Sequence, residues 1–480
     1  MERDSKRSLE EPAEKIPLEV IGDILSRVRI ARDMIRASLT CKMWREAYCK
    51  HLHTLSFNDF DDRVYQELPT SDLEVLITTT IFQTPALRKL CIQIDDKHEF
   101  SAGSVVGWLM SARDNLSELF YKVRTSPSVN VLDICGRRKL ETLTLGYYTI
   151  RGVEPSFQRF PSLTSLCLLC VTISIEDLNK LLLCVPKLER LELNTLFLQD
   201  PDEVGLPELT VKLCFLTLKT LLIEDIQGFE FRLEKCDIEY LRVIECAFDS
   251  FRVSDSQSLR RFRFSFSNAR LLEIEEGDNL EILEIIDSHV SQSNLFPMKI
   301  QAPKLKSFRV WGLDNKLSMS FEGAGETVLD GSRLVLDLER TAVCSPQLTH
   351  LAIYCDYALC DLEHHNEGFS SLENVGVLEV GCEVLDGFWE WAEKVLRRCP
   401  NVRKLIIHMI IDKYKNLLPP LHYATTNTSR NKMLRKYHCE DLAERTSSAV
   451  EMMRKYPHLQ VEFVYVYRYD RYDFLDDCLS

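Results

Sequence analysis

The chain has 480 residues, more than a single compact core usually holds, so it must divide into domains or extend by repetition. A hydrophobic content of 45% and a charged content of 28% are ordinary for a folded protein and exclude wholesale disorder. The formal net charge of −14 argues against a nucleic-acid-binding protein, whose surface is typically basic.

The N-terminal segment and the cysteines both favour a reducing compartment. The segment MERDSKRSLEEPAEK is charged and lacks the apolar run of a signal peptide, and no later window approaches eighteen uninterrupted apolar residues. The seventeen cysteines are an odd number, scattered through apolar runs rather than placed at framework spacings. We therefore expect reduced, buried thiols, a cytoplasmic or nuclear location and no membrane contact.

The first fifty residues predict a disordered tail followed by three short helices. Residues 1–14 form the charged tail. One face of the first helix is marked by apolar residues at helical spacing, namely Leu18, Ile21, Leu25 and Val28. Asp33 is expected to cap a second helix that starts at Met34, and residues 42–50 continue as a third.

Beyond residue 55 the sequence repeats a short L-x-x-L-x-L pattern, mostly at intervals of 20 to 30 residues. This period and pattern are typical of a leucine-rich repeat, in which each unit supplies one strand and a return segment. The alternative is a set of strands in an ordinary sheet. The leading apolar residues are Leu87, Leu116, Leu140, Leu163, Leu188, Leu218, Ile238, Leu259, Leu280, Leu305, Leu348, Leu372 and Val402.

The return segments are expected to differ along the chain. Residues 174–185 and 386–399 predict helices, whereas the segments between 218 and 280 are too short for more than a turn. The sequence SRLVLDLER suggests a degenerate unit, and residues 412–440 form a polar, turn-rich insertion. A helix at 447–456 and the strand-like LQVEFVYVY would form a C-terminal cap.

The helical segment resembles an F-box, and the whole chain is similar to land-plant F-box/LRR-repeat proteins. The resemblance rests on Ile16, Pro17, Leu18 and Glu19, on Ile24 to Ser26, on Asp33, and on Cys41, Lys42, Trp44 and Arg45. It implies an F-box at 15–57 and an α/β fold, a leucine-rich-repeat solenoid with a parallel inner sheet, at 58–480.

The same resemblance implies a substrate receptor of a Skp, cullin and F-box (SCF) ubiquitin ligase. Its F-box would bind a Skp adaptor, and through it a cullin, while the repeats hold a target protein. The expected adaptor-binding residues are Pro17, Leu18, Ile24, Leu25 and Trp44. The apolar side chains of the helical segment also favour a binding partner, since three short helices cannot bury their own apolar surface. The alternative is a scaffold whose N-terminal helices only cap the solenoid.

No catalytic, metal or cofactor site is expected. Cys167 and Cys170 have C-x-x-C spacing, but residues i and i+3 of a strand point to opposite faces. The sequence EHHNE lacks the histidine spacing of a helical zinc site, and GAGE lacks the lysine of a phosphate-binding loop. The sequence therefore predicts a protein that is not an enzyme.

The expected target-binding surface is the inner sheet of the later repeats, where equivalent positions of neighbouring strands align. Arginine forks beside aromatic rings suit an acidic or phosphorylated segment. The residues concerned are Tyr240, Arg242, Arg261, Arg263, Arg309, Trp311 and Tyr354. Two alternatives remain: Glu284 pairs with Arg263 and Arg309 on a solvated face, or the basic segment at 427–438 captures the target.

Overall fold

The structure is a computed structural model that divides into two compact units, Met1–Ile226 (unit 1) and Gln227–Ser480 (unit 2). It describes residues 16–28, 30–58, 63–95, 97–135, 138–153, 160–198, 210–227, 230–275, 277–286, 298–300, 302–311, 319–320, 345–355, 372–382, 388–411, 447, 450–451 and 453–467. The expected tail, the SRLVLDLER unit and the insertion at 412–440 lie outside the described residues.

Unit 1 begins with three helices, α1 (Leu18–Arg27), α2 (Ala31–Ser38) and α3 (Lys42–His51), referred to below as the helical block. The second helix starts three residues earlier than expected. Asp33 therefore lies in its first turn, and the N-cap is Ile30, which makes no side-chain hydrogen bond. Helices α1 and α3 pack closely, because a Cβ on Gly22 would lie 2.4 Å from Cβ of His51.

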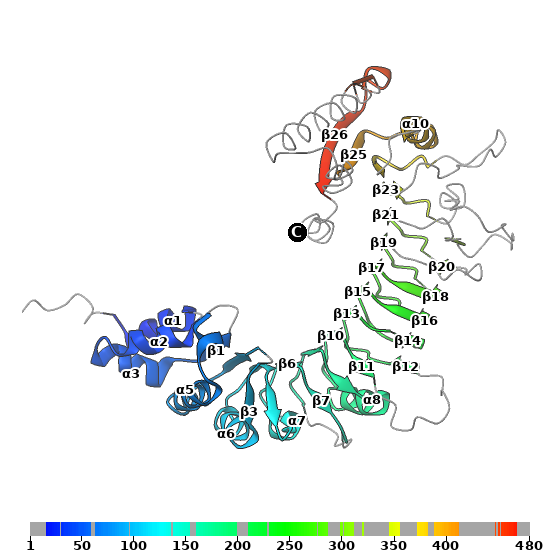
Figure 1. The fold of residues 1–480 in the computed structure, drawn as a ribbon. Coiled ribbons are helices and arrows are strands. Elements are labelled where there is room, and N and C mark those ends of the chain that lie inside the picture. Colours follow the sequence, from blue (N-terminus) through cyan, green and yellow to red (C-terminus); the bar gives the residue numbers. More distant parts are fainter. Residues whose placement is uncertain are drawn as a thin grey trace, which may run out of the picture. The chain divides into compact units, whose positions relative to one another are not determined.

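The block leads directly into a parallel sheet (Figure 1). The strands of this sheet in unit 1, in spatial order, are β1 (Thr54–Asn58), β2 (Lys89–Gln93), β4 (Glu118–Lys122), β6 (Thr142–Gly146), β8 (Ser165–Leu169), β10 (Arg190–Asn194) and β13 (Thr220–Glu224). The first four residues of β1 lie within the segment expected to be F-box, 15–57, and the sheet starts at Thr54.

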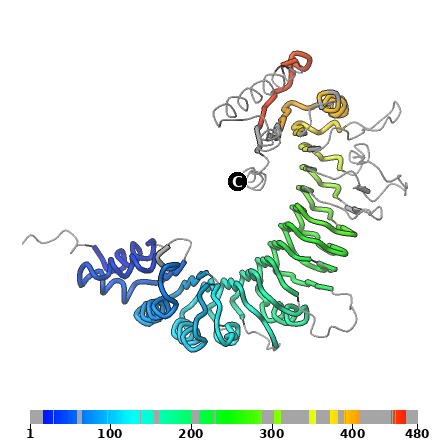
Figure 2. Tube along the Cα trace, in the orientation of Figure 1, coloured from blue at the N-terminus to red at the C-terminus, as the bar shows by residue number. Residues whose placement is uncertain are grey.

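Helices cover one side of this sheet (Figure 2), and short strands form separate sheets. The helices are α4 (Arg63–Glu67), α5 (Thr70–Phe82), α6 (Ala102–Ala112), α7 (Val131–Cys135) and α8 (Ile175–Leu183). The short strands are β3 (Glu99–Ser101), β5 (Arg124–Ser126), β7 (Thr149–Ile150), β9 (Thr172–Ile173), β11 (Phe197–Leu198) and β12 (Thr210–Leu213). They belong to other sheets: β3 pairs with β5, β9 lies between β7 and β11, and β12 is the first strand of a sheet that continues in unit 2.

Unit 2 continues the same strand pattern. Its parallel sheet contains β15 (Tyr240–Ile244), β17 (Arg261–Ser265), β19 (Ile282–Ile286), β21 (Ser307–Trp311), β23 (His350–Cys355), β24 (Val377–Cys382), β25 (Lys404–Ile411) and β26 (Gln460–Tyr467). Strand β26, expected from LQVEFVYVY, pairs with β25. Helix α10 (Phe388–Arg398) occupies the return segment where a helix was expected.

The expected fold class, an α/β solenoid with a parallel inner sheet, is confirmed. Each predicted leading residue, from Leu87 to Val402, is nearly fully buried, and each predicted repeat leads into a strand of a parallel sheet. These residues are buried because a single repeat is too small to bury its leucines alone and must pack them against the neighbouring repeats. Ser174 accepts a hydrogen bond from the Asp177 N–H at 3.0 Å, which caps the expected helix α8.

The return segments of unit 2 differ from expectation, because they form strands rather than turns. A second parallel sheet contains β14 (Glu230–Glu234), β16 (Ala247–Ser254), β18 (Asn268–Ile274), β20 (Met298–Ile300) and β22 (Met319–Ser320). Aromatic rings link the two sheets, since Phe251 stacks at 5.4 Å on Phe231 and at 6.2 Å on Phe262 of β17. Short segments thus bury apolar side chains by alternation instead of by helical periodicity.

A left-handed residue ends many of the strands. The residues with φ near +50° directly after a strand are Tyr147, Cys170, Thr195, Asp225, Lys235, Glu245, Asp255 and Phe266. This conformation turns the chain sharply out of the sheet at the same point of successive repeats. Among the described residues, no helix is both long enough and apolar enough to cross a membrane.

Candidate binding surfaces

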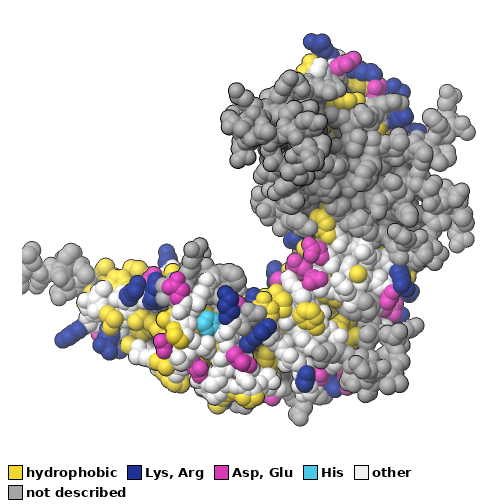
Figure 3. Space-filling model, viewed as in Figure 1, with side chains coloured by type: hydrophobic (Ala, Val, Ile, Leu, Met, Phe, Trp, Pro, Cys, Tyr) yellow, Lys and Arg dark blue, Asp and Glu magenta, His cyan; other side chains and the backbone are white. Residues whose placement is uncertain are grey.

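The helical block exposes one apolar stripe. Ile16, Val20 and Ile24 are spaced four residues apart and are exposed to 37%, 44% and 41%. Residues at this spacing share one face of a helix. Leu39, between α2 and α3, is exposed to 68%. Hydrophobic side chains are visible over the block in Figure 3, and such a cluster typically marks a contact surface.

The residues expected to bind the adaptor divide into surface and core. Pro17, the N-cap of α1, and Ile24 are exposed, and Leu18 and Trp44 are half-buried. Leu25 is fully buried in the chain. It is needed for the core of the block, because the face of α1 that carries Ile21 and Leu25 is the buried one.

The expected columns of the inner sheet of unit 2 are present in the observed register. Arg242, Arg263, Glu284 and Arg309 are paired in sequence across β15, β17, β19 and β21. The same column continues through Ala352 to Glu379. Since these strands are parallel and in register, their side chains form one ladder.

Glu284 is the centre of this ladder. Arg261 donates through Nη2 to its Oε2 at 3.2 Å, and Arg309 donates through Nη1 to its Oε1 at 3.1 Å. Glu284 and Arg263 are each exposed to only 2%. The expected ion pair of Glu284 with Arg309 is therefore present. The expected solvated face is not, because Glu284 and Arg263 are both shielded from solvent.

A second carboxylate, Glu379, lies further along the ladder. His350 and His408 contact its two oxygens at 2.7 and 3.1 Å, and Nη2 of Arg309 lies 3.5 Å from Oε1. Burial alone raises the pKa of Glu379, but the two histidine hydrogen bonds and the charge of Arg309 outweigh it. The pKa is therefore held below its usual value of 4.5, and the side chain stays ionised.

The remaining expected target-binding residues lie on the same sheet. Tyr240, Arg242 and Arg261 are half-buried, and the guanidinium of Arg261 lies 5.6 Å from the centre of the Tyr240 ring. Trp311 and Tyr354 are paired in register on β21 and β23. Their side chains lie outside the described part of the structure.

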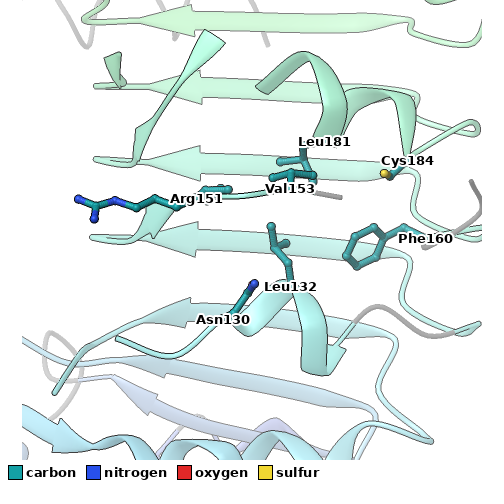
Figure 4. Close-up of a pocket in the computed structure, with 8 residues that line it drawn as sticks. Asn130, Leu132, Arg151, Val153, Phe160, Leu181 and Cys184 are labelled. Atoms are coloured by element: carbon teal, nitrogen blue, oxygen red, sulfur yellow. The ribbon is translucent and has the colours of Figure 1, made fainter. Parts of the chain in front are cut away.

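A small cavity in unit 1 has room for about one water molecule. It is lined largely by apolar groups such as Leu132, Val153 and Phe160, and the Arg151 side chain points away from them (Figure 4). Burial raises the pKa of Cys167 to about 12. In the ranges given above, no three His, Cys, Asp or Glu side chains form a group that suits a metal ion.

Comparison with known proteins agrees with this architecture. Residues 105–200 match the family model described as FBD-associated F-box protein At5g56370, LRR repeats. The chain is also 40% identical over 452 residues to the F-box/LRR-repeat protein At1g67190 of Arabidopsis thaliana, covering 94% of this chain and 99% of that protein. The chain belongs to the F-box/LRR-repeat family. Its resemblance to that family and its interpretation as leucine-rich repeats are therefore confirmed.

Several residues of this F-box/LRR-repeat chain escaped the sequence patterns. Val20 completes the stripe on α1 between Ile16 and Ile24, as its four-residue spacing indicates. Glu379 and His408 occupy the inner-sheet columns of the repeats that start at 372 and 402. Extending those columns from Val402 would have identified His408, whereas Glu379 is reached only if the repeat is counted from Val375 instead of Leu372, because Ala352 pairs with Glu379.

Proposed function

We propose that this chain is the substrate-recognition subunit of an SCF-type E3 ubiquitin ligase. In this role α1 to α3 bind a Skp adaptor and, through it, a cullin, while the repeats bind the protein to be ubiquitinated. The observation that carries the proposal is the stripe of Ile16, Val20 and Ile24, in a chain of the F-box/LRR-repeat family. The block itself is too small to cover this stripe.

The same proposal makes the chain a non-catalytic subunit of the complex, since recognition needs two binding surfaces and no reacting group. We place it in the cytoplasm or nucleus, where thiols remain reduced. The free, buried thiols of Cys135 and Cys399 suit such a compartment.

For the target, we propose the inner sheet of unit 2 around Tyr240, Arg242 and Arg261. An arginine fork beside an aromatic ring is a frequent anchor in protein interfaces. The ion pairs of Arg261 and Arg309 with Glu284 would hold these guanidinium groups in fixed positions. Preorganised side chains lose less entropy when a partner binds.

The adaptor role is tested by co-purification of the full chain with a Skp adaptor. Ile24→Asp places an unpaired charge in the proposed interface and should abolish retention. Leu216→Asp, at a site in unit 1 that is 78% exposed, is the matched control and should retain the adaptor. Equal retention by both variants would favour the alternative in which the block only caps the repeats.

A further inference from the structure

Helices α5 and α6 expose an apolar surface that the proposed function does not use. Val75 and Phe82 on α5 are exposed to 65% and 56%, and Val106 and Met110 on α6 to 36% and 44%. We call these four residues the α5–α6 face. The opposite side of α6 is also apolar, with Val105, Trp108 and Leu109 fully buried. A helix that is hydrophobic all round is normally covered on all sides.

The four side chains belong to one continuous surface. The two helices are in contact, since the Trp108 Nε1 donates to the Thr78 hydroxyl at 2.7 Å. The Phe82 ring lies 3.7 Å from the position of a Cβ on Gly107. The exposed residues between them are uncharged, namely Thr79, Gly103 and Ser111. Figure 3 shows hydrophobic side chains in this part of unit 1.

The end of the face at the helix N-termini is acidic. Glu74 in α5 accepts a hydrogen bond from Ser101, the N-cap of α6, so the starts of both helices lie together. The acidic residues at this end are Asp72, Glu74 and Glu99, and all are at least partly exposed. Two basic residues lie nearby: Lys97 is paired with Asp95 at 3.2 Å, and Arg124 is the strand partner of Glu99, so this end carries a net negative charge.

The opposite end is mainly basic. Arg113 directly follows α6, and Lys139 donates to Oδ1 of Asn115 at 3.2 Å, which places Lys139 beside the end of α6. Arg138 is exposed next to Lys139. Two acidic residues lie there: Asp114 pairs with Arg113 at 3.4 Å, and Glu141 is exposed two residues after Lys139, so this end carries a net positive charge. The face is therefore an uncharged centre between an acidic and a basic end.

We propose that the α5–α6 face binds the same face of a second copy of this chain, with the helices antiparallel across a two-fold axis. A two-fold contact needs a self-complementary surface. This surface meets the requirement, because antiparallel packing sets the acidic end of each copy against the basic end of the other. The apolar centres then cover one another and leave water. The α1 stripe and the inner sheet of unit 2 are formed by other residues.

Sedimentation velocity of the full chain at increasing concentration tests the proposal. We expect a monomer–dimer equilibrium, and Met110→Asp should raise the dimer Kd by at least about tenfold, because it buries an unpaired carboxylate. Leu183→Asp is the matched control, at a residue 63% exposed on α8, and should dimerise as wild type does. A wild type that stays monomeric, or a Met110→Asp variant that dimerises normally, would overturn the proposal.

A charge-reversal pair tests the antiparallel arrangement. One variant reverses the acidic end (Asp72→Lys with Glu99→Lys), and the other reverses the basic end (Arg113→Glu with Lys139→Glu). Each variant alone brings like charges together and should remain monomeric at concentrations where wild type dimerises. An equimolar mixture should form heterodimers at low salt. Failure of the mixture to associate, with both variants folded, would refute the antiparallel contact.

Discussion

Arg309 and Glu284 form a buried ion pair between neighbouring strands of unit 2, with Nη1 and Oε1 3.1 Å apart. They are adjacent in space because β19 and β21 pair in register, although the residues are 25 positions apart in the chain. Arg309 also lies 3.5 Å from Glu379, so it connects the two carboxylates of the ladder. An ion pair so shielded from water depends on both of its partners.

Replacing Glu284 with Gln should destabilise unit 2. The change leaves Arg261 and Arg309 without the carboxylate between them, and breaking a buried pair typically costs about 3 kcal/mol. Glu281→Gln is the matched control, because Glu281 pairs with Lys306 at an exposed site and should cost under about 1 kcal/mol. Urea unfolding of the variants measures both values. Equal stability of the two variants would mean that the ion pairs of Glu284 with Arg261 and Arg309 do not stabilise the fold.

The ionised Glu379 should make the stability of the protein depend on pH. Its pKa in the folded state lies below its usual value of 4.5, so the group stabilises the fold above that pH. This contribution is lost as the pH falls below about 4.5, where the unfolded chain takes up a proton and the folded chain does not. Melting temperatures from pH 7 to pH 3 should therefore fall less steeply for Glu379→Gln than for wild type. Parallel curves would exclude this role.

A methyl group on Gly22 should disrupt the helical block. An added Cβ would lie 2.4 Å from Cβ of His51 and 2.8 Å from its carbonyl oxygen, and neither is the free end of a flexible side chain. Gly22→Ala should thus separate α1 from α3 at a cost of about 1 to 3 kcal/mol. Gly376→Ala adds the same group in open space and is the control. Faster hydrogen exchange at 18–51 in the Gly22 variant alone is the expected result.

The leucine pattern predicted the inner strands well, because the leucines that repeat in sequence are the ones that must be buried. A similar alternation occurs at the first strand, where Leu52, Leu55 and Phe57 are fully buried. The F-box motif ends close by, at Arg45, so the sequence assigns these residues to that domain. The boundary between the block and the sheet is therefore visible in the sequence only when both patterns are compared.

Other features of the structure depend on packing between distant segments, which a local sequence pattern does not reveal. Leu25 fits the F-box motif, but only the packing of α1 on α3 decides that it faces inward. The strands in the return segments of unit 2, such as 230–234, depend on neighbouring segments for their hydrogen bonds. The sequence also does not determine which arginine of β17 pairs with Glu284. Arg261 and Arg263 are only two residues apart, and the side-chain rotamers decide which of them reaches the carboxylate.

Asp177, in the first turn of α8, should stabilise the segment that follows β7. Its carboxylate accepts hydrogen bonds from the N–H groups of Gly152 and Val153 at 3.1 and 2.9 Å. Asp177→Ala removes both charge-assisted bonds and should lower the free energy of unfolding by about 2 kcal/mol. Glu176→Ala, one residue earlier, removes only an exposed pair with Lys180 and should cost about 0.5 kcal/mol. Chemical denaturation, with hydrogen exchange at 149–153, distinguishes the two variants.

The proposed target surface predicts that capture depends on Arg242. If this half-buried arginine contacts an acidic or phosphorylated segment, Arg242→Ala should weaken binding by about 2 kcal/mol or more, and binding should fall as salt rises. Arg270→Ala is the control, because Arg270 is exposed on β18 of the other sheet and pairs with Asp249. Both variants should retain the Skp adaptor, since the block is separate from these residues.

Quantitative proteomics of proteins bound to each variant provides the measurement. A partner that is lost with Arg242→Ala, but kept with Arg270→Ala and at equal adaptor recovery, supports the inner sheet as the target site. Deleting residues 427–438 tests the alternative basic segment. If that deletion removes the partner while Arg242→Ala leaves the partner set unchanged, the target does not bind the inner sheet. Arg242 and the segment 427–438 are both basic, so a salt dependence alone cannot tell which of them binds the target. Removing each one separately identifies the target-binding site.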